Sequence, residues 1–191
     1  MDNTQAFLPP IEKPKGLMMK LVYYLTKRQL GKVITPVKVF SARLPMAFGM
    51  MGTKVYQLDK KLVIPKELIF LIRHQVDRMN VCDFCMDIGR YNAMKELMNE
   101  EKFNAINEYN ASPLFSDAER AALDYATELT KEKKVNPQTF SRMAKYYSER
   151  EICEIVYLIS SEHLSNITNI GLNIHSDMFC DISKRKVVQS R

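Results

Sequence analysis

The sequence predicts an all-α protein. Of its 191 residues only 6 are Gly and 8 are Pro, whereas 12 are Met and Leu, Ile, Lys and Glu are frequent, a composition that favours helices over a turn-rich β protein. Apolar residues recur at helical spacing, and two Ser-x-x-Glu capping boxes mark helix starts. With 46% hydrophobic and 26% charged residues, the chain is suited to one sizeable core, so we expect a single domain.

The first part of the chain is predicted to be an arm followed by helical segments. Residues 1–15 carry three prolines and few apolar anchors, which indicates an irregular arm. A helix is expected from residue 16 to about residue 30, where Gly31 stops it. Thr35-Pro36 has the form of an N-cap followed by proline, so a second helix starts there until Pro45 kinks or ends it. Residues 46–58 are expected to continue as helix.

The later helices are recognised from prolines, apolar periodicity and capping boxes. They are expected to start at Pro65, near Asn80, near Glu101, at Ser116, at Asn136-Pro137 and at Ser148. The helix at Asn136 is expected to run to about Tyr147, and the last helical stretch, through residues 164–172, ends near Asn173. These elements predict one helical domain over residues 16–183 and a polar tail at 184–191.

The charge pattern does not indicate nucleic-acid binding. The 28 Lys and Arg residues exceed the 22 Asp and Glu residues and give a net charge of +6, but they are spread along the chain and form no basic helix interleaved with aromatic residues. We find no secretory signal and no apolar run of transmembrane length. We therefore expect a cytoplasmic protein that binds neither membranes nor nucleic acids.

The most informative motif is a Cys-x-x-Cys pair, Cys82 and Cys85. On a helix these positions share one face, so the two sulfurs can form a disulfide. If the helix begins at Asn80 as its N-cap, both sulfurs lie near the first turn, where unpaired N–H groups and the helix dipole stabilise a thiolate. In a reducing cytoplasm such a pair is more often redox-active or metal-binding than structural.

Other interpretations of the pair remain open. A zinc site needs two more ligands, but Cys153, Cys180 and the three histidines form no second pair, so we expect no metal and no cofactor. A buried structural pair is the ordinary alternative, because an apolar setting raises a thiol pKa, and flanking carboxylates at Asp83 and Asp87 also disfavour a thiolate. Cys153 itself is expected to be a small core residue.

Several segments together resemble one protein family. They are residues 66–71 with 80–85, residues 112–123, and residues 148–152 with 169–172. They look like the carboxymuconolactone decarboxylase and alkylhydroperoxidase-D-like (AhpD-like) superfamily, over roughly residues 40–180. The resemblance implies an AhpD-like orthogonal helical bundle that is an obligate trimer or hexamer, with the cysteines near a subunit interface. It also implies thiol peroxidase (peroxiredoxin) or disulfide-reductase activity in members that keep both cysteines.

The resemblance fails at the proton relay. The redox members of the family have a histidine four residues after the second cysteine, where this chain has Gly89, and a glutamate about three helical turns before the first cysteine, near Phe70. We hypothesise that His74, one turn after Phe70, replaces the missing histidine, and that Glu67 lies further along the same face. The predicted catalytic residues are therefore Cys82, Cys85, His74 and Glu67. His163 is a weaker candidate, more typical of a core or interface histidine, and Tyr91, Asn92, Asn166 and Asn169 are candidates to line a cleft near the cysteines.

The sequence thus predicts a thiol-dependent oxidoreductase. Its dithiol is expected to reduce a small peroxide or disulfide and to be restored by a dithiol reductant. One alternative is a decarboxylase or isomerase of a small carboxylated lactone, the other activity of the family, which does not need the cysteine pair. The other is a non-catalytic helical scaffold or ligand binder that lost activity with the histidine.

Overall fold

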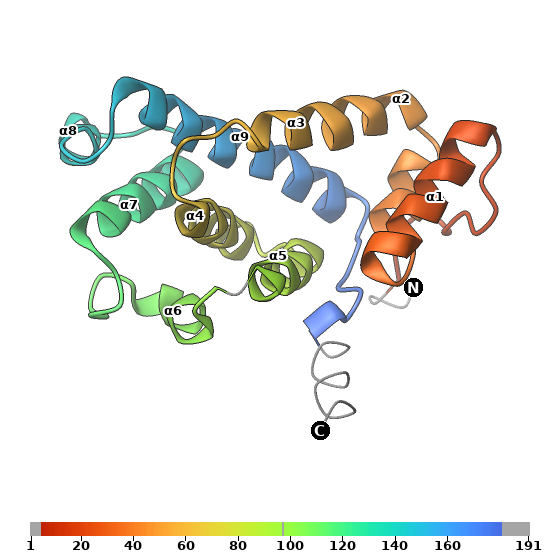
Figure 1. The fold of residues 1–191 in the computed structure, drawn as a ribbon, viewed down its shortest axis with the longest axis horizontal. Coiled ribbons are helices and arrows are strands. Elements are labelled where there is room, and N and C mark those ends of the chain that lie inside the picture. The colour runs from red at the N-terminus through yellow and green to blue at the C-terminus, as the bar shows by residue number, and fades with distance from the viewer. Residues whose placement is uncertain (1–4, 97, 181–191) are drawn as a thin grey trace.

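The chain folds around one central helix, α4 (Lys66–Met79). Helices α5 (Asp83–Lys95), α7 (Asp117–Glu132) and α9 (Glu149–Gly171) all pack against it (Figure 1). The structure, a computed structural model, describes residues 5–96 and 98–180, and every regular element within these ranges is helical. The prediction of an all-α protein is therefore confirmed.

The other helical elements are shorter or lie at the edges of the bundle (Figure 1). They are α1 (Leu17–Leu30), the π-helical turn η1 (Val37–Ser41), α2 (Pro45–Phe48), the π-helical turn η2 (Gly49–Lys54), α3 (Val55–Asp59), α6 (Glu100–Asn104), the 3₁₀ turn η3 (Ala105–Glu108) and α8 (Pro137–Met143). None of the helices in the described ranges combines the length and the apolarity needed to cross a bilayer.

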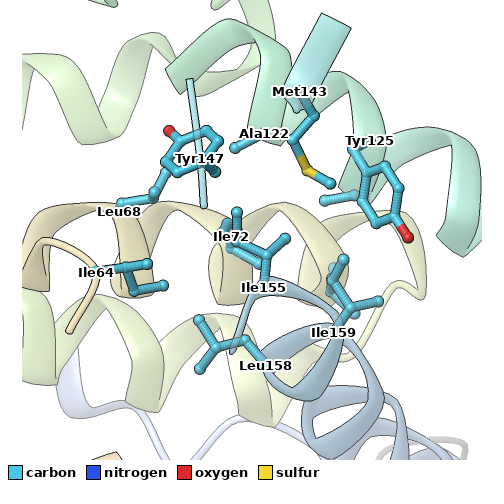
Figure 2. Close-up of a cluster of buried hydrophobic side chains, with 12 residues drawn as sticks. Ile64, Leu68, Ile72, Ala122, Tyr125, Met143, Tyr147, Ile155, Leu158 and Ile159 are labelled. Carbon is cyan, nitrogen blue, oxygen red and sulfur yellow. The ribbon is translucent and has the colours of Figure 1, made fainter. Parts of the chain in front are cut away.

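The principal core lies between α4, α7, α8 and α9 (Figure 2). Leu68 and Ile72, one turn apart on α4, are buried with Ala122 of α7, Met143 of α8 and Ile155 of α9. This is the apolar face that the helical periodicity predicted for α4. This core fixes α4 between α7 and α9. Truncating one of the buried Leu or Ile side chains of the core to Ala lowers the free energy of unfolding by about 2–5 kcal/mol.

Most predicted helix boundaries are confirmed. Gly31 ends α1 in the left-handed region, with φ of 80°, and both capping boxes form complete reciprocal hydrogen bonds at Ser116 and Ser148. The helix expected to start at Ser148 and the last helical stretch, expected through residues 164–172, are one continuous helix, α9, which ends at Gly171. The tail predicted at 184–191 lies outside the described residues.

Other expectations were wrong. The helix expected from Thr35-Pro36 does start there, but residues 37–41 are π-helical and the element ends at Ser41, before Pro45. Helix α8 ends at Met143, four residues before Tyr147. After it the hydrogen bonds change to the i→i−3 pattern, since the Tyr146 N–H donates to the Met143 carbonyl at 3.0 Å. Cys153 is exposed, since α9 turns that position away from its buried Ile155.

An irregular arm, residues 5–15, is held against the carboxyl end of α9. The Phe7 N–H donates to the Leu172 carbonyl at 3.0 Å, and the Asn173 amide donates to the Gln5 carbonyl at 2.7 Å. Ala6 of the arm and Ile174 belong to the apolar cluster that surrounds both cysteines. Both ends of the described chain thus cover the cysteine pair.

Candidate functional site

The Cys-x-x-Cys pair lies at the junction of α4 and α5. The Asn80 N–H donates to the Val76 carbonyl at 3.0 Å, so Asn80 closes α4, and the expectation that it caps the cysteine helix was wrong. Val81 turns the chain in the left-handed region, with φ of 55°, which is unfavourable for a β-branched residue. Cys82 therefore becomes the N-cap of α5, and Cys85 lies in its first turn.

The two cysteines form a disulfide with their Cα atoms 5.3 Å apart. Both residues are buried, Cys82 at 1% and Cys85 at 3% exposure. The contact of the two sulfurs predicted from the i,i+3 spacing is confirmed. Because they lie at the amino-terminal end of α5, its free N–H groups and dipole favour a thiolate in the reduced state.

A cavity of about 310 Å³ opens beside the pair, and Cys85 lines it whereas Cys82 does not. Most of its wall is apolar and comes from η1, α4 and α5 together with the segment before η1. The apolar lining residues are Ile34, Pro36, Val37, Phe40, Phe70, Phe84 and Ile88. The cavity is therefore suited to a small apolar molecule placed against the Cys85 sulfur.

The rest of the cavity lining is largely polar. The Asn169 amide of α9 donates to the Cys85 sulfur at 3.3 Å, an interaction that favours the thiolate once the disulfide is reduced. Asn92 of α5 also lines the cavity, so Asn92 and Asn169 lie where the sequence suggested. Asn166 does not line the cavity but donates to Asp77, which does, and Tyr91 packs on Phe179 instead, with ring centroids 5.1 Å apart.

Two carboxyl groups lie beside Cys85. Side-chain oxygens of Asp77 and Glu162 and the Cys85 sulfur are all within 4.8 Å of one another. Burial, and then the neighbouring Glu162 carboxyl, hold the pKa of Asp77 well above its usual value. Burial also raises the pKa of Glu162, against the attraction of Arg73. Because the two carboxyls lie close together and burial disfavours their charged forms, one of them keeps a proton.

A wider network fixes this pair. The Asn166 amide donates to Asp77 Oδ1 at 2.7 Å, and Arg73 Nε lies 3.3 Å from Glu162 Oε2. Arg73 also donates to both oxygens of Asp59, at 3.0 and 2.9 Å. The guanidinium therefore pairs with two carboxylates, Glu162 and Asp59. Asp77 is a third acidic group beside the same cation, so a proton neutralises one of the carboxyls.

Gly89 leaves space beside the Asp77–Glu162 pair. A Cβ atom at this position would lie 3.4 Å from Asp77 Oδ2, an ordinary van der Waals contact. The absence of a base here, seen in the sequence, is thus accompanied by a carboxyl oxygen that faces the same position from α4.

The structure separates the two predicted relay residues. His74 lines the cavity with Cys85, and burial, with Arg78 and Arg90 nearby, lowers its pKa to about 4, so the ring is neutral at neutral pH. Its ring packs on Phe103 with centroids 4.1 Å apart. The predicted catalytic role of His74 remains a prediction.

Glu67 is not brought to the cavity. Its carboxylate lies 3.2 Å from the Lys102 ammonium, which also pairs with Glu119 at 2.6 Å. Phe70 separates the two regions, since it borders both the cysteine cavity and the shallow depression beside Glu67. A role for Glu67 in proton transfer to the cysteines thus has no geometric support in the described residues.

The remaining histidines have structural contacts. His163 Nδ1 is 3.1 Å from the Asn80 amide, and burial lowers its pKa. His175 Nδ1 is 3.5 Å from Asp83 Oδ2. Although burial acts to raise it, hydrogen bonds from the Phe179 and Cys180 N–H groups hold the pKa of Asp87 below its usual value.

The sequence interpretation missed Asp77, Glu162 and Arg73. A signal was present: Arg73 and Asp77 are one turn apart on the helix that carries His74, and Glu162 continues the buried face of α9 after Ile159. Asp77, Cys85 and Glu162 also have three potential metal-ligand atoms in reach of one another. In the disulfide form the sulfur is bonded to Cys82 and is not available as a thiolate ligand.

Comparisons with known proteins show the fold. No protein-family model matches the chain. The uncharacterized protein YnjA of Escherichia coli K12 is 28% identical over 185 residues, which cover 94% of this chain and 98% of YnjA. A cysteine-to-alanine variant of the debrominase Bmp8, in complex with 2,3,4-tribromopyrrole, superposes with a TM-score of 0.81 at 20% identity over 97% of this chain and 100% of that one.

The alkylhydroperoxidase AhpD core of a peroxidase-related protein from Ralstonia eutropha JMP134 superposes with a TM-score of 0.68 at 16% identity. The match covers 90% of this chain and 95% of that one. The chain therefore has the AhpD-like helical fold, and the fold implied by the resemblance is confirmed.

Proposed function

We propose that this protein is a thiol-dependent oxidoreductase that reduces a small apolar substrate with Cys82 and Cys85. The observation that carries the proposal is the position of Cys85. Its sulfur is bonded to Cys82 and at the same time lines a largely apolar cavity of about 310 Å³. A dithiol that can close a disulfide next to a substrate cavity can deliver two electrons there.

For a peroxide substrate, Cys85 attacks first because only its sulfur lines the cavity. The thiolate bonds to one peroxide oxygen, the O–O bond breaks, and the other oxygen leaves as an alcohol after taking up a proton. Cys85 is then a sulfenic acid, which the Cys82 thiol attacks to form the disulfide and release water. The two thiols are oxidised, the peroxide is reduced, and an external dithiol restores the pair in a reducing compartment such as the cytoplasm.

Reductive removal of bromine is a second candidate, favoured by the similarity to the debrominase Bmp8 over nearly the whole chain. Here the Cys85 thiolate takes the bromine, the carbon left behind takes up a proton, and Cys82 displaces bromide to form the disulfide. The aromatic lining at Phe40, Phe70 and Phe84 fits a flat halogenated ring.

A carboxylated lactone fits the cavity less well. Arg73 is the cation among its described lining residues, and Asp59 and Glu162 already neutralise it. A lactone carboxylate would thus enter beside two acidic groups with no free partner in that lining.

Assembly into a homo-oligomer is part of the proposal. Leu164, Ile167 and Ile170 are 42–65% exposed at helical spacing on α9, and Leu17, Leu21 and Tyr24 are 55–85% exposed on α1. Such stripes are typical of subunit interfaces. Light scattering on the purified protein tests this, with a trimer or hexamer expected and a monomer contradicting it.

The test of function begins with the fully reduced protein. Cumene hydroperoxide or tetrabromopyrrole is added, and the Cys82–Cys85 disulfide is followed by peptide mass spectrometry. We expect Cys85→Ser to abolish the reaction, and Cys82→Ser to stop at a Cys85 sulfenic acid that dimedone traps. Cys153→Ser, at an exposed cysteine, is the matched control and should react like the wild type. A wild-type pair that reacts with neither compound would support the scaffold or binder alternative.

A further inference from the structure

The proton that the reaction consumes needs a donor beside Cys85. A thiolate that attacks a peroxide leaves an alkoxide, and one that takes bromine leaves a carbanion, so both reactions depend on an acid at the cavity wall. The position that carries histidine in the redox members of the family is Gly89. His74, which lines the cavity, is neutral, and its Nδ1 is buried without a hydrogen-bond partner.

The Asp77–Glu162 pair is the acidic group in reach of this sulfur. Asp77 is 2% exposed, the Glu162 side chain is 14% exposed, and both line the cavity. Their oxygens are within 4.8 Å of the Cys85 sulfur, close enough to protonate an atom bonded to it. Asn166 holds Asp77 Oδ1, while Oδ2 faces the open position at Gly89.

The charges around the pair keep one proton on it. Arg73 of α4 is shared between Glu162 and Asp59 of α3, and both partners lie 2.9–3.3 Å from it. The other titratable groups nearby are His74, which is neutral, and Cys85 itself. One cation cannot balance three neighbouring carboxylates, of which Asp77 is buried, so one carboxyl stays protonated. Arg73 pairs with Glu162, whereas the hydrogen-bond donor to the buried Asp77 is the neutral Asn166 amide, so Asp77 is the member that keeps the proton.

We propose that Asp77 is the general acid of the reaction, giving its proton to the group that leaves when the Cys85 thiolate attacks, while Glu162 positions that proton. This inference rests on the proposed thiol-dependent reduction. The O–O or C–Br bond breaks, the new O–H or C–H bond takes the Asp77 proton, and Asp77 becomes a carboxylate. The proton that the Cys85 thiol loses before the next turnover restores the pair.

Substrates that differ in leaving group separate acid catalysis from a structural effect. The leaving group of cumene hydroperoxide is an alkoxide that must be protonated, whereas the leaving group of 3-chloroperbenzoic acid is a stable carboxylate that needs no proton. Asp77→Asn keeps the shape and can still accept from Asn166. We expect it to slow the reaction with cumene hydroperoxide about 100-fold or more, and the reaction with the peracid only a few-fold.

Two further variants complete the test. Glu162→Gln removes the negative charge that helps to keep the proton on Asp77, and it should give a smaller loss with the same dependence on the leaving group. Glu154→Gln, which removes another buried carboxylate of α9 far from the cavity lining, is the matched control and should react like the wild type with both oxidants.

The outcomes distinguish the two proposals. Equal losses with both oxidants in Asp77→Asn, or no loss with either, overturn the role of Asp77 while the dithiol function stands. A wild-type protein that reduces neither oxidant nor tetrabromopyrrole overturns the proposed function and the role of Asp77 with it. Circular dichroism establishes that each variant is folded. Asp77→Asn should be at least as stable as wild type at neutral pH, because the neutral amide avoids the burial penalty that raises the Asp77 pKa.

Discussion

His74 gives the protein a pH-dependent stability that can be predicted in size and sign. Its pKa is about 4 in the folded protein, compared with 6.5 for a free histidine. The unfolded chain therefore binds a proton below about pH 6.5 that the folded protein does not bind until pH 4. Stability is full above that range and falls as the pH falls through it.

The magnitude follows from the two pKa values. Each pKa unit corresponds to about 1.4 kcal/mol, so the free energy of unfolding is lowered by about 2 kcal/mol at about pH 5 and by about 3 kcal/mol near pH 4. In a protein of this length 1 kcal/mol shifts the melting temperature by about 2–4 °C, so the shift at about pH 5 is roughly 4–8 °C.

The variant that tests this is His74→Phe, which keeps a ring against Phe103 but cannot be protonated. Urea unfolding of both proteins is compared between about pH 8 and pH 5, so that the contributions of all other groups cancel in the difference. We expect the wild type to lose about 2 kcal/mol more than the variant over this range. A difference that stays constant with pH would falsify the inference that His74 is buried and neutral.

The same variant bears on function. A ring that is protonated only near pH 4 stores no proton at neutral pH, so His74→Phe should keep most of the rate of peroxide-driven disulfide formation. A large loss of that rate would instead support the sequence-based hypothesis that His74 takes part in proton transfer.

Three further predictions concern the cavity and its surroundings. Gly89→Ala should stabilise the protein by about 0.5–1 kcal/mol in urea unfolding, since the residue is inside α5 and the added Cβ has no contact closer than 3.4 Å; destabilisation would show that the space is needed. Asn169→Leu removes the N–H donor to the Cys85 sulfur and should raise the pKa of that thiol, measured by iodoacetamide alkylation against pH; an unchanged profile would contradict the contact. Glu67→Gln should leave the rate of thiol oxidation unchanged and lower stability by at most about 1 kcal/mol, because its partly exposed ion pair with Lys102 lies outside the cavity; a loss of rate would restore Glu67 as a relay residue.

Much of the fold followed from local signals. The boxes at Ser116 and Ser148 and the stop at Gly31 depend on hydrogen bonds and backbone angles within a few residues, so the sequence predicted them correctly. The start of the cysteine helix was misplaced at Asn80. The choice between Asn80 and Cys82 as N-cap depends on the left-handed turn at Val81, which has no marker in residue type.

By itself the sequence determined the helical class, the closeness of the Cys82 and Cys85 sulfurs and the absence of a base at position 89. Each of these depends only on residue type and short spacing. Only the tertiary structure decided which acid lies beside the Cys85 sulfur. Asp77 and Glu162 meet because α4 and α9 pack against each other, whereas Glu67 lies two turns before His74 on α4, beyond Phe70, where it pairs with Lys102. Contacts between distant helices depend on how whole apolar faces are buried together, which no local pattern specifies.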